Sequence, residues 1–254
     1  MISLQHGLDL LRQAMDRLER ALAPKGEICL CCGSEHRHKA LLPLCRRCWE
    51  VIPWILQVDC PVCGRYESCP DCGRRQETWF VRNRSVVRYD EQMKEWLAQY
   101  KYRGQERLRG LFGRMLLHAY HLHRSAQGIK ALTEIVTYVP LSEERYMERG
   151  FNQAEQMAAE LGKLAGLPVI PLLRRARHTD KQSFKARAER LDDLRGAFVL
   201  DPVNGGKLSA AAGSQRLCVY IIDDVYTTGS TLNECARTLR GAGDIEVYGL
   251  SWAR

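Results

Sequence analysis

Four Cys-x-x-Cys pairs follow one another in the first third of the chain: Cys29/Cys32, Cys45/Cys48, Cys60/Cys63 and Cys69/Cys72. Thiolates at this spacing converge on one ion, and four of them complete a closed tetrahedral zinc site. Joining neighbouring pairs predicts two zinc ions, one held by the first two pairs and one by the last two. Because four protein ligands leave no open coordination position, we expect both ions to stabilise the fold and not to catalyse.

The cysteine pattern leaves two alternatives open. Cys31 could replace a neighbouring ligand, and the short interval between Cys63 and Cys69 also permits a single zinc ion with one vestigial pair. Three of the pairs are followed directly by a glycine: Gly33, Gly64 and Gly73. Glycine there suits a tight turn that points backbone N–H groups at the sulfurs. Cys218 and Cys235 fall within strand and helix patterns, where buried, inert thiols are expected.

A second group of chemically useful residues follows the apolar run 217–222. Two acids, Asp223 and Asp224, come first, and a polar loop comes next: Thr227, Thr228, Gly229, Ser230 and Thr231. In an open α/β sheet, ligands bind at the carboxyl ends of the strands. The loop hydroxyls, the backbone N–H groups and the dipole of the following helix would hold a phosphate monoester. The acids repel phosphate, so we expect them to hold ribose hydroxyls of the same ligand; an ordinary strand-to-helix turn without a ligand is the alternative.

The elements that position these residues alternate between helix and strand patterns. Helices are expected over 90–101, 105–124, 152–165 and 230–241, and strands over 80–89, 134–139, 197–200, 217–222 and 245–252, with a short extended piece at 168–173. Such alternation predicts an α/β fold with a mostly parallel sheet and helices on both faces.

Composition divides the chain into three predicted segments: an amphipathic helix over 1–24, a cysteine-rich zinc-ribbon module over 25–80 and the α/β domain over 81–254. Leucine and methionine recur every three or four residues in the first segment, which gives the helix one apolar stripe. This stripe could pack on its own protein or form a coiled-coil contact with another chain. The middle segment lacks a periodic apolar pattern, so zinc would have to replace a core there.

The net charge of +8 favours polyanionic partners such as nucleic acid or phosphorylated metabolites. Charged residues interrupt positions 1–23, which argues against a secretory signal, and no apolar run is long enough to cross a bilayer. We therefore expect a cytoplasmic protein without a transmembrane segment. In that reducing compartment, the cysteine-rich pattern is better interpreted as a set of metal ligands than as a disulfide framework.

The block 217–231 resembles the phosphoribosyl pyrophosphate motif of the type I phosphoribosyltransferases, in which apolar residues precede two acids and a Thr-Thr-Gly-x-Thr loop. Roughly residues 28–254 are similar to the ComF family of competence-associated proteins, which includes the GntX type. Besides the cysteine pairs, the matching residues are Val139-Pro140-Leu141, Arg149-Gly150-Phe151-Asn152-Gln153-Ala154, Arg174, Arg177, Thr179, Gln182, Arg190, Ala197-Phe198, Thr231-Leu232 and Val247. Asp193 departs from the pattern, because family members commonly carry Asn there.

The resemblance implies a type I phosphoribosyltransferase-like fold that binds phosphoribosyl pyrophosphate, or a related sugar phosphate, together with Mg²⁺. In the family the two acids, here Asp223 and Asp224, hold the ribose diol as catalytic groups, and the loop cradles the 5′-phosphate. Arg149 and Arg145 become candidate ligands of the pyrophosphate, with solvated helix-end arginines as the alternative. Asn152 is first expected to cap the helix that follows it.

The basic loop 174–182 corresponds by position to the family's mobile loop, which closes over the substrate. The same cations could instead follow a nucleic-acid backbone, or they could simply be solvated.

The chemistry implied is displacement of pyrophosphate at C1 of the ribose through a transition state with oxocarbenium character, with Mg²⁺ and arginines stabilising the departing charge. The sequence shows no acceptor site. We therefore expect a phosphoribosyltransferase-like protein that acts in DNA uptake and handles single-stranded DNA, with DNA-uptake proteins as possible partners. The alternative is a non-catalytic, zinc-stabilised nucleic-acid-binding or adaptor protein that uses the fold as a ligand sensor.

Overall fold

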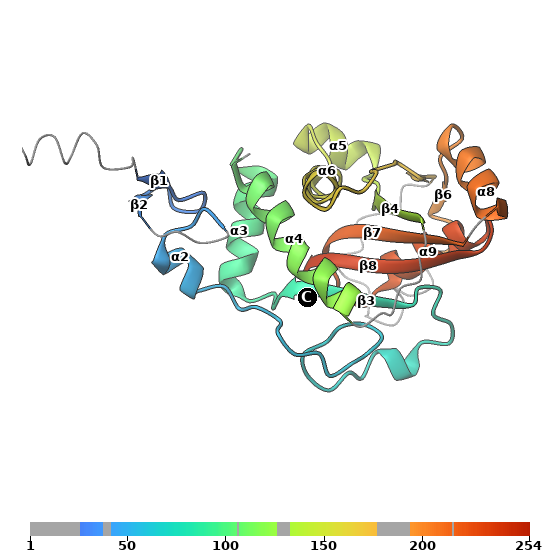
Figure 1. The fold of residues 1–254 in the computed structure, drawn as a ribbon, viewed down its shortest axis with the longest axis horizontal. Helices are drawn as coiled ribbons and strands as arrows, with labels where there is room; N and C mark the ends of the chain where they lie inside the picture. Colours follow the sequence, from blue (N-terminus) through green and yellow to red (C-terminus); the bar gives the residue numbers. More distant parts are fainter. Residues whose placement is uncertain (1–25, 38–41, 106, 126–132, 177–193, 215) are drawn as a thin grey trace, which may run out of the picture. The chain divides into compact units, whose positions relative to one another are not determined.

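The computed structural model describes residues 26–37, 42–105, 107–125, 133–176, 194–214 and 216–254 (Figure 1). The chain forms two compact units, Met1–Cys48 and Trp49–Arg254. The second cysteine tetrad therefore belongs to the same unit as the sheet. The predicted helix over residues 1–24 and most of the basic loop, from residue 177 to residue 193, lie outside the described residues.

The first unit contains a short antiparallel hairpin and the start of a helix. Strands β1 (Glu27–Ile28) and β2 (Glu35–His36) pair with each other, and α2 (Arg46–Glu50) carries Cys48. Hydrogen bonds from Cys29 N to Ser34 O (2.9 Å) and from Gly33 N to Cys29 O (2.9 Å) close the turn between the strands. This turn brings the first two cysteines together.

The second unit is built on a four-stranded sheet. Its strands are β3 (Arg82–Val87), β8 (Ile245–Ala253), β7 (Leu217–Val225) and β4 (Thr133–Tyr138), in that spatial order, and every neighbouring pair is parallel. A separate antiparallel pair consists of β5 (Leu173–Arg175) and β6 (Phe198–Leu200). All four carboxyl ends of the main sheet consequently lie at one edge.

Helices cover both faces of this sheet (Figure 1). The helices are α3 (Glu91–Tyr102), α4 (Arg107–Ser125), α5 (Glu143–Arg149), α6 (Gln153–Ala165), α8 (Asn204–Ser214) and α9 (Ser230–Arg240), and the short 3₁₀ helix η1 spans Cys72–Arg74. α4 and α6 pack against each other and against the sheet, and α9 packs against β7 and β8. The α/β prediction of a parallel sheet with flanking helices is therefore confirmed.

The burial of β7 shows how the two faces differ. Leu217, Val219 and Ile221 belong to the buried cluster that α9 completes. On the opposite face the ring of Tyr220 lies 5.3 Å from that of Tyr120 and 5.9 Å from that of His123, both on α4. Because side chains alternate along a strand, the side chains of Asp223 and Asp224 start from different faces near the end of β7.

The helices that lead into the site begin and end at recognisable caps. Asn152 accepts a hydrogen bond from Ala154 N (2.9 Å) at the start of α6, as predicted, and its side-chain amide also donates to Val139 O (3.0 Å). Gly150 has a φ of 76° and ends α5, since only glycine adopts this conformation readily. These caps fix the turn between β4 and α6.

Within the predicted α/β domain, the described helices α5 and α8 escaped the sequence prediction. In α5 no residue is buried, so there is no apolar stripe to find. In α8 two glycines occupy the first turn and weaken the helical signal. The extended piece predicted at 168–173 is divided between two sheets. Val136 on β4 donates a hydrogen bond to Pro168 O and accepts one from Ile170 N, whereas Leu173 is the first residue of β5.

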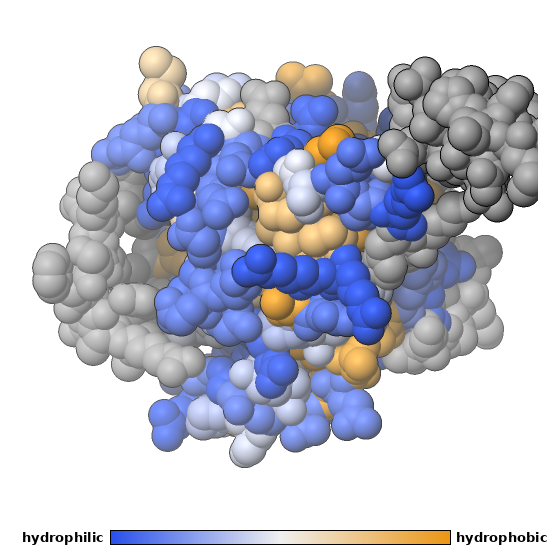
Figure 2. Space-filling view, turned by 90° about the vertical axis from the view of Figure 1, so that its left-hand side faces the viewer, coloured by the Kyte–Doolittle hydropathy of each residue, from blue (hydrophilic) through white to orange (hydrophobic). Residues whose placement is uncertain are grey.

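The surface drawn in Figure 2 is formed mainly by hydrophilic residues, with hydrophobic residues in small separate areas. Within the described part of the chain, none of the helices combines the length and the apolar character that a bilayer crossing requires.

His123 on α4 is fully buried beneath the sheet. Its Nε2 lies 2.9 Å from the carbonyl oxygen of Gly249 and must therefore carry the proton that it donates. Burial, supported by the nearby charges of Arg84 and Arg82, lowers the pKa of His123 from 6.5 to about 3. The imidazole thus stays neutral in the folded protein at any moderately acidic pH.

We expect this histidine to make the protein acid-sensitive. Above pH 6.5 both states carry a neutral imidazole, but below it only the unfolded state gains the proton, so stability is lost as the pH falls toward 3. Between pH 7 and pH 5 the loss attributable to His123 should be about 2 kcal/mol. Urea unfolding of wild type and His123→Gln at both pH values measures it, and equal pH dependence of the two proteins would refute it.

Candidate functional site

The two predicted acids are adjacent at the carboxyl end of β7, and their carboxyl groups interact with each other. Asp224 Oδ2 forms an ion pair with Lys101 on α3 and accepts a hydrogen bond from Gln153 Nε2 on α6 (2.9 Å). Asp223 has no ion-pair partner among the described residues, and its Oδ1 accepts from the backbone amide of Asp224 (2.8 Å). Only Asp223 thus remains available to a ligand without displacing a bound cation.

Their surroundings shift the two carboxyl groups in opposite directions. Burial, together with repulsion from Asp224, raises the pKa of Asp223 well above its ordinary value. Burial alone would also raise the pKa of Asp224, but the Lys101 ammonium and the Gln153 amide outweigh it, and the pKa is lowered. At the end of β7, Asp224 is therefore stable as a carboxylate. Asp223 ionises less readily, and a bound cation or hydrogen-bond donor would favour its ionised form.

Arg149 reaches Asp224 through one intervening side chain. Its Nη1 donates to Gln153 Oε1 (3.0 Å), the residue whose amide nitrogen donates to Asp224, and its Nη2 donates to Tyr102 Oη (2.8 Å). Its guanidinium also lies over the Tyr102 ring, 5.0 Å from the centroid. The structure thus brings Arg149 into the site, whereas Arg145 is exposed on α5.

The predicted phosphate loop joins β7 directly to α9. Gly229 has a φ of 79°, and a Cβ atom there would lie 2.1 Å from Tyr226 Oη, so glycine is required. The hydroxyls of Thr228 and Ser230 lie 2.7 Å apart, Thr227 is exposed and Thr231 is half-buried at the start of the helix. The first N–H groups of α9 have no acceptors within the helix, so hydroxyls and amides together form an arrangement suited to an anion.

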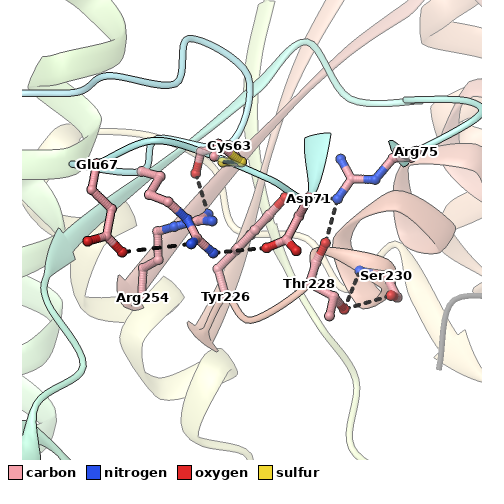
Figure 3. Close-up of polar contacts among 10 residues, drawn as sticks. Cys63, Glu67, Asp71, Arg75, Tyr226, Thr228, Ser230 and Arg254 are labelled. Atoms are coloured by element: carbon pink, nitrogen blue, oxygen red, sulfur yellow. Dashed lines mark hydrogen bonds and ion pairs between the residues drawn. The ribbon is translucent and has the colours of Figure 1, made fainter. Parts of the chain in front are cut away.

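A side chain from the segment after the second tetrad holds this loop in place (Figure 3). Arg75 Nη2 donates to Thr228 O (2.5 Å) and to Tyr226 Oη (3.2 Å). Close by, Trp79 N donates to Asn233 Oδ1 (2.8 Å), and Asn233 Nδ2 donates to Glu77 O (3.0 Å). Segment 75–79 therefore fixes the position of both the loop and the first turns of α9 through hydrogen bonds.

Two cavities flank the loop. One of about 530 Å³ includes Tyr226 and Thr227 in its wall, and one of about 250 Å³ includes Ser230 and Arg75. Neither of these two cavities is lined by Asp223 or Asp224.

The cysteine pairs assemble as neighbouring pairs, as predicted. The sulfurs of Cys29, Cys32, Cys45 and Cys48 lie within 4.8 Å of one another, and so do those of Cys60, Cys63, Cys69 and Cys72. Tetrahedral zinc with sulfur at about 2.3 Å requires sulfur separations of about 3.8 Å. The distances from Cys32 to Cys45 (3.7 Å) and from Cys63 to Cys69 (3.4 Å) are close to this value. Each tetrad could therefore hold a zinc ion, and Cys31 belongs to neither.

The turns within the tetrads match the glycine prediction only in part. Gly33 and Gly64 have φ values of 75° and 73°, as a tight turn requires. Gly73 has a negative φ and lies in η1, so its glycine is not needed for that turn. In the first tetrad, hydrogen bonds from Ser34 lower the pKa of Cys32 to about 6, which favours the thiolate that binds metal.

Several residues of the site gave no signal in the sequence. Lys101 and Arg75 lie far along the chain from β7 and meet it only in the fold. Gln153 lies in the matched motif around Arg149, but nothing in its spacing indicated that it would bridge Arg149 to Asp224.

We expect Cys69→Ser to lower the zinc content from two ions to about one per chain and to lower the melting temperature, because bound metal contributes folding free energy. Cys31→Ser is the matched control and should retain both ions, because Cys31 is outside both tetrads. Metal analysis after gel filtration, with thermal melts, measures both effects. Loss of an ion in Cys31→Ser, or a single ion in the wild type, would show that the assignment of ligands is wrong.

No protein-family model matches the chain. The solved structure of an allosteric regulatory enzyme of purine biosynthesis is similar over 61% of this chain and 29% of its own, with a TM-score of 0.35 and 19% identity. This chain thus spans less than a third of that protein's length.

Curated relatives match this chain over most of their own length. Competence protein F of Haemophilus influenzae is 28% identical over 229 residues, which cover 88% of this chain and 90% of the relative. Competence protein ComFC of Bacillus subtilis is 32% identical over 242 residues, which cover 85% of this chain and 90% of the relative. The chain therefore belongs to the family of competence protein ComFC.

Proposed function

We propose that this protein binds phosphoribosyl pyrophosphate with Mg²⁺ at the end of β7 and acts in the cytoplasm in DNA uptake, where it contacts single-stranded DNA. One observation carries the proposal: a buried strand ends in Asp223 and Asp224 and turns at once, through a loop that requires Gly229, into the first turn of α9. Such a turn can hold a phosphate beside a carboxylate that meets the sugar. The names of the relatives support the competence role.

Each part of the site suits one part of the ligand. The amides at the start of α9 and the hydroxyls of Thr228 and Ser230 would bind the 5′-phosphate. Asp223 would accept hydrogen bonds from the ribose hydroxyls, which favours its ionised form. Arg149 would bind the pyrophosphate, because its Nε has no acceptor among the described residues although it is buried. Arg145 is exposed and could join it only from the rim.

Carboxylate oxygens are ligands that Mg²⁺ accepts, and Asp223, free of any ion pair in the described structure, fits that role. Bound with the ligand, Mg²⁺ would neutralise charge on the pyrophosphate oxygens. Asp224 is better suited to positioning: its charge is balanced by Lys101, and it orients Gln153 and, through it, Arg149.

If the site turns over, the bond between C1 and the pyrophosphate oxygen breaks with its electron pair, and an acceptor forms the new bond at C1. Arg149 and the metal stabilise the departing anion, and the chain needs no covalent nucleophile.

The alternative function is a zinc-stabilised ligand sensor or adaptor without catalysis. The ion pair of Lys101 with Asp224 favours it, because this pair leaves one of the two acids committed to the protein. Both functions predict ligand binding, and only the first predicts release of pyrophosphate when an acceptor is supplied.

Calorimetric titration with phosphoribosyl pyrophosphate tests the site. We expect Mg²⁺-dependent binding that Asp223→Asn weakens roughly tenfold or more, as befits the loss of hydrogen bonds to a charged group. Asp244→Asn is the matched control, because this exposed acid precedes β8 at the opposite edge of the sheet. Wild-type protein that fails to bind, or Asp223→Asn that binds as tightly as wild type, would overturn the proposal.

Arg75→Ala should also weaken this binding, by about tenfold, although Arg75 need not touch the ligand. The substitution removes the donor group that binds Thr228 O and Tyr226 Oη, so the loop is less ordered before the ligand binds. The ligand must then order the loop, and this entropic cost lowers its affinity. Hydrogen exchange should become faster at the loop amides and stay unchanged elsewhere. A global destabilisation would instead raise the exchange rate throughout the protein. Arg109→Ala, at an exposed position on α4, should leave both unchanged. Unaltered loop exchange in Arg75→Ala would contradict the positioning role.

A further inference from the structure

The cavity of about 530 Å³ lies where three strands of the sheet end. Its walls come from residues 225–227 at the end of β7, residues 88–90 after β3 and Arg254 after β8. Residues 65–67, which follow the first pair of the second tetrad, Cys60/Cys63, complete the wall. The carboxyl ends of parallel strands are the usual location of ligand sites in such sheets. Its size is within the range of small-molecule sites.

Aromatic rings and guanidinium groups alternate around this cavity. Arg88 lies over the ring of Tyr66, with its Cζ atom 5.5 Å from the centroid, and Arg254 lies over the ring of Tyr226 at 4.6 Å. Tyr66 is 36% exposed, so part of its ring is open to a ligand. A planar aromatic ligand could stack on this ring, because aromatic and guanidinium planes both receive nucleobases.

The charges of the wall favour an anion. Its two acids already have partners: Asp90 Oδ1 accepts from Met93 N (2.8 Å) as the cap of α3, and Glu67 lies 3.7 Å from Arg65, which lines the same cavity. Arg88 and Arg254 have no ion-pair partner among the described residues.

Arg254 provides a second, independent indication of a ligand. Its Nη1 donates to Cys63 O (2.8 Å; Figure 3), but its Nε and Nη2 are buried and meet no acceptor in the described part of the chain. Buried donors of a charged group are rarely left without an acceptor. An oxygen of an anionic ligand would supply one.

We propose that this cavity binds a nucleotide unit, with the base stacked on Tyr66 and the phosphate held by Arg88 and Arg254. Free phosphate would leave the rings unused, and an uncharged aromatic compound would leave the arginines unsatisfied. Thr227 lies in the same wall, so the nucleotide lies directly beside the phosphate loop. The inference locates the nucleic-acid contact and rests on that part of the proposed function, but it does not require sugar-phosphate binding at α9.

Two probes distinguish the source of the nucleotide: thymidine 5′-monophosphate and a short, 5′-phosphorylated oligothymidylate with a fluorescent label at its other end. Calorimetry measures binding of the first to the full chain, and fluorescence anisotropy measures binding of the second. Tyr66→Ala should weaken binding roughly tenfold, the usual effect of removing one stacked ring, and Arg88→Ala should weaken it by a similar factor. Tyr66→Phe keeps the ring and should bind like wild type. Arg114→Ala, which removes an exposed charge on α4, should do the same.

The outcomes separate the possible errors. Weakened binding of both probes, or of the monophosphate alone, identifies a nucleotide site, and weakened binding of the oligonucleotide alone identifies the strand as its source; affinity for the strand should fall with salt. If wild type binds the strand and Tyr66→Ala and Arg88→Ala bind it equally well, the location is wrong while the proposed DNA contact stands. If wild type binds neither probe at low salt, the location and the DNA contact both fail, whereas the phosphoribosyl pyrophosphate titration remains a separate result. Unchanged zinc content and melting temperature establish that each variant is folded.

Discussion

The desolvation of two adjacent carboxylates is the constraint on which the site depends. A charge buried without a partner is costly, and Asp223 and Asp224 end a strand whose preceding residues are fully buried. The fold meets this cost unevenly: Lys101 and Gln153 stabilise the ionised form of Asp224, and nothing comparable stabilises that of Asp223. Among the described residues, Lys101 forms an ion pair with Asp224 and none does so with Asp223, so only one of the two acids is neutralised. The other retains a high affinity for whatever cation or donor reaches it, which is the property that a binding site needs.

The second cysteine tetrad is part of this arrangement and not a separate appendage. Asn83 of β3 donates to Cys63 O (3.2 Å) and to Ser251 Oγ on β8 (3.2 Å), and Gly64 packs so closely on Asn83 that a Cβ atom would lie 2.6 Å from the carbonyl oxygen of Asn83. The segment that follows the tetrad then supplies Arg75 to the phosphate loop. The segment also joins the buried cluster of the sheet through Cys60, Cys63 and Phe80, and it positions a loop that must be precise. Metal ligation can provide the rigidity that packing would otherwise provide.

Much of the fold could be predicted from the sequence because the patterns that indicate its elements are local. The apolar run before Asp223, the Cys-x-x-Cys spacing and the cap at Asn152 each depend on residues a few positions apart, and the structure contains the expected strand, tetrads and cap. The residues that contact Asp223 and Asp224 could not be predicted in this way. Lys101 reaches Asp224 across more than a hundred residues, and no periodicity marks such a contact. Strand geometry starts the two side chains from different faces of β7, but only the fold shows that a lysine reaches Asp224. The weak helices α5 and α8 lacked the apolar stripe on which the prediction relied.

Tyr226 is the point at which the two flanks of the loop meet. Its hydroxyl accepts from Arg75 on one flank (3.2 Å), its ring lies under Arg254 on the other (4.6 Å), and its edge packs against Phe80 (6.4 Å between centroids). The residue is buried, and a close-packed ring cannot shift on one flank without moving its contacts on the other. A ligand that reorients Arg254 would therefore alter the support that Arg75 gives to Thr228. By linkage, if a ligand in the cavity changes the affinity of the loop for its own ligand by some factor, the loop's ligand changes the affinity of the cavity by the same factor. The two sites share one buried side chain, so their affinities are expected to depend on each other.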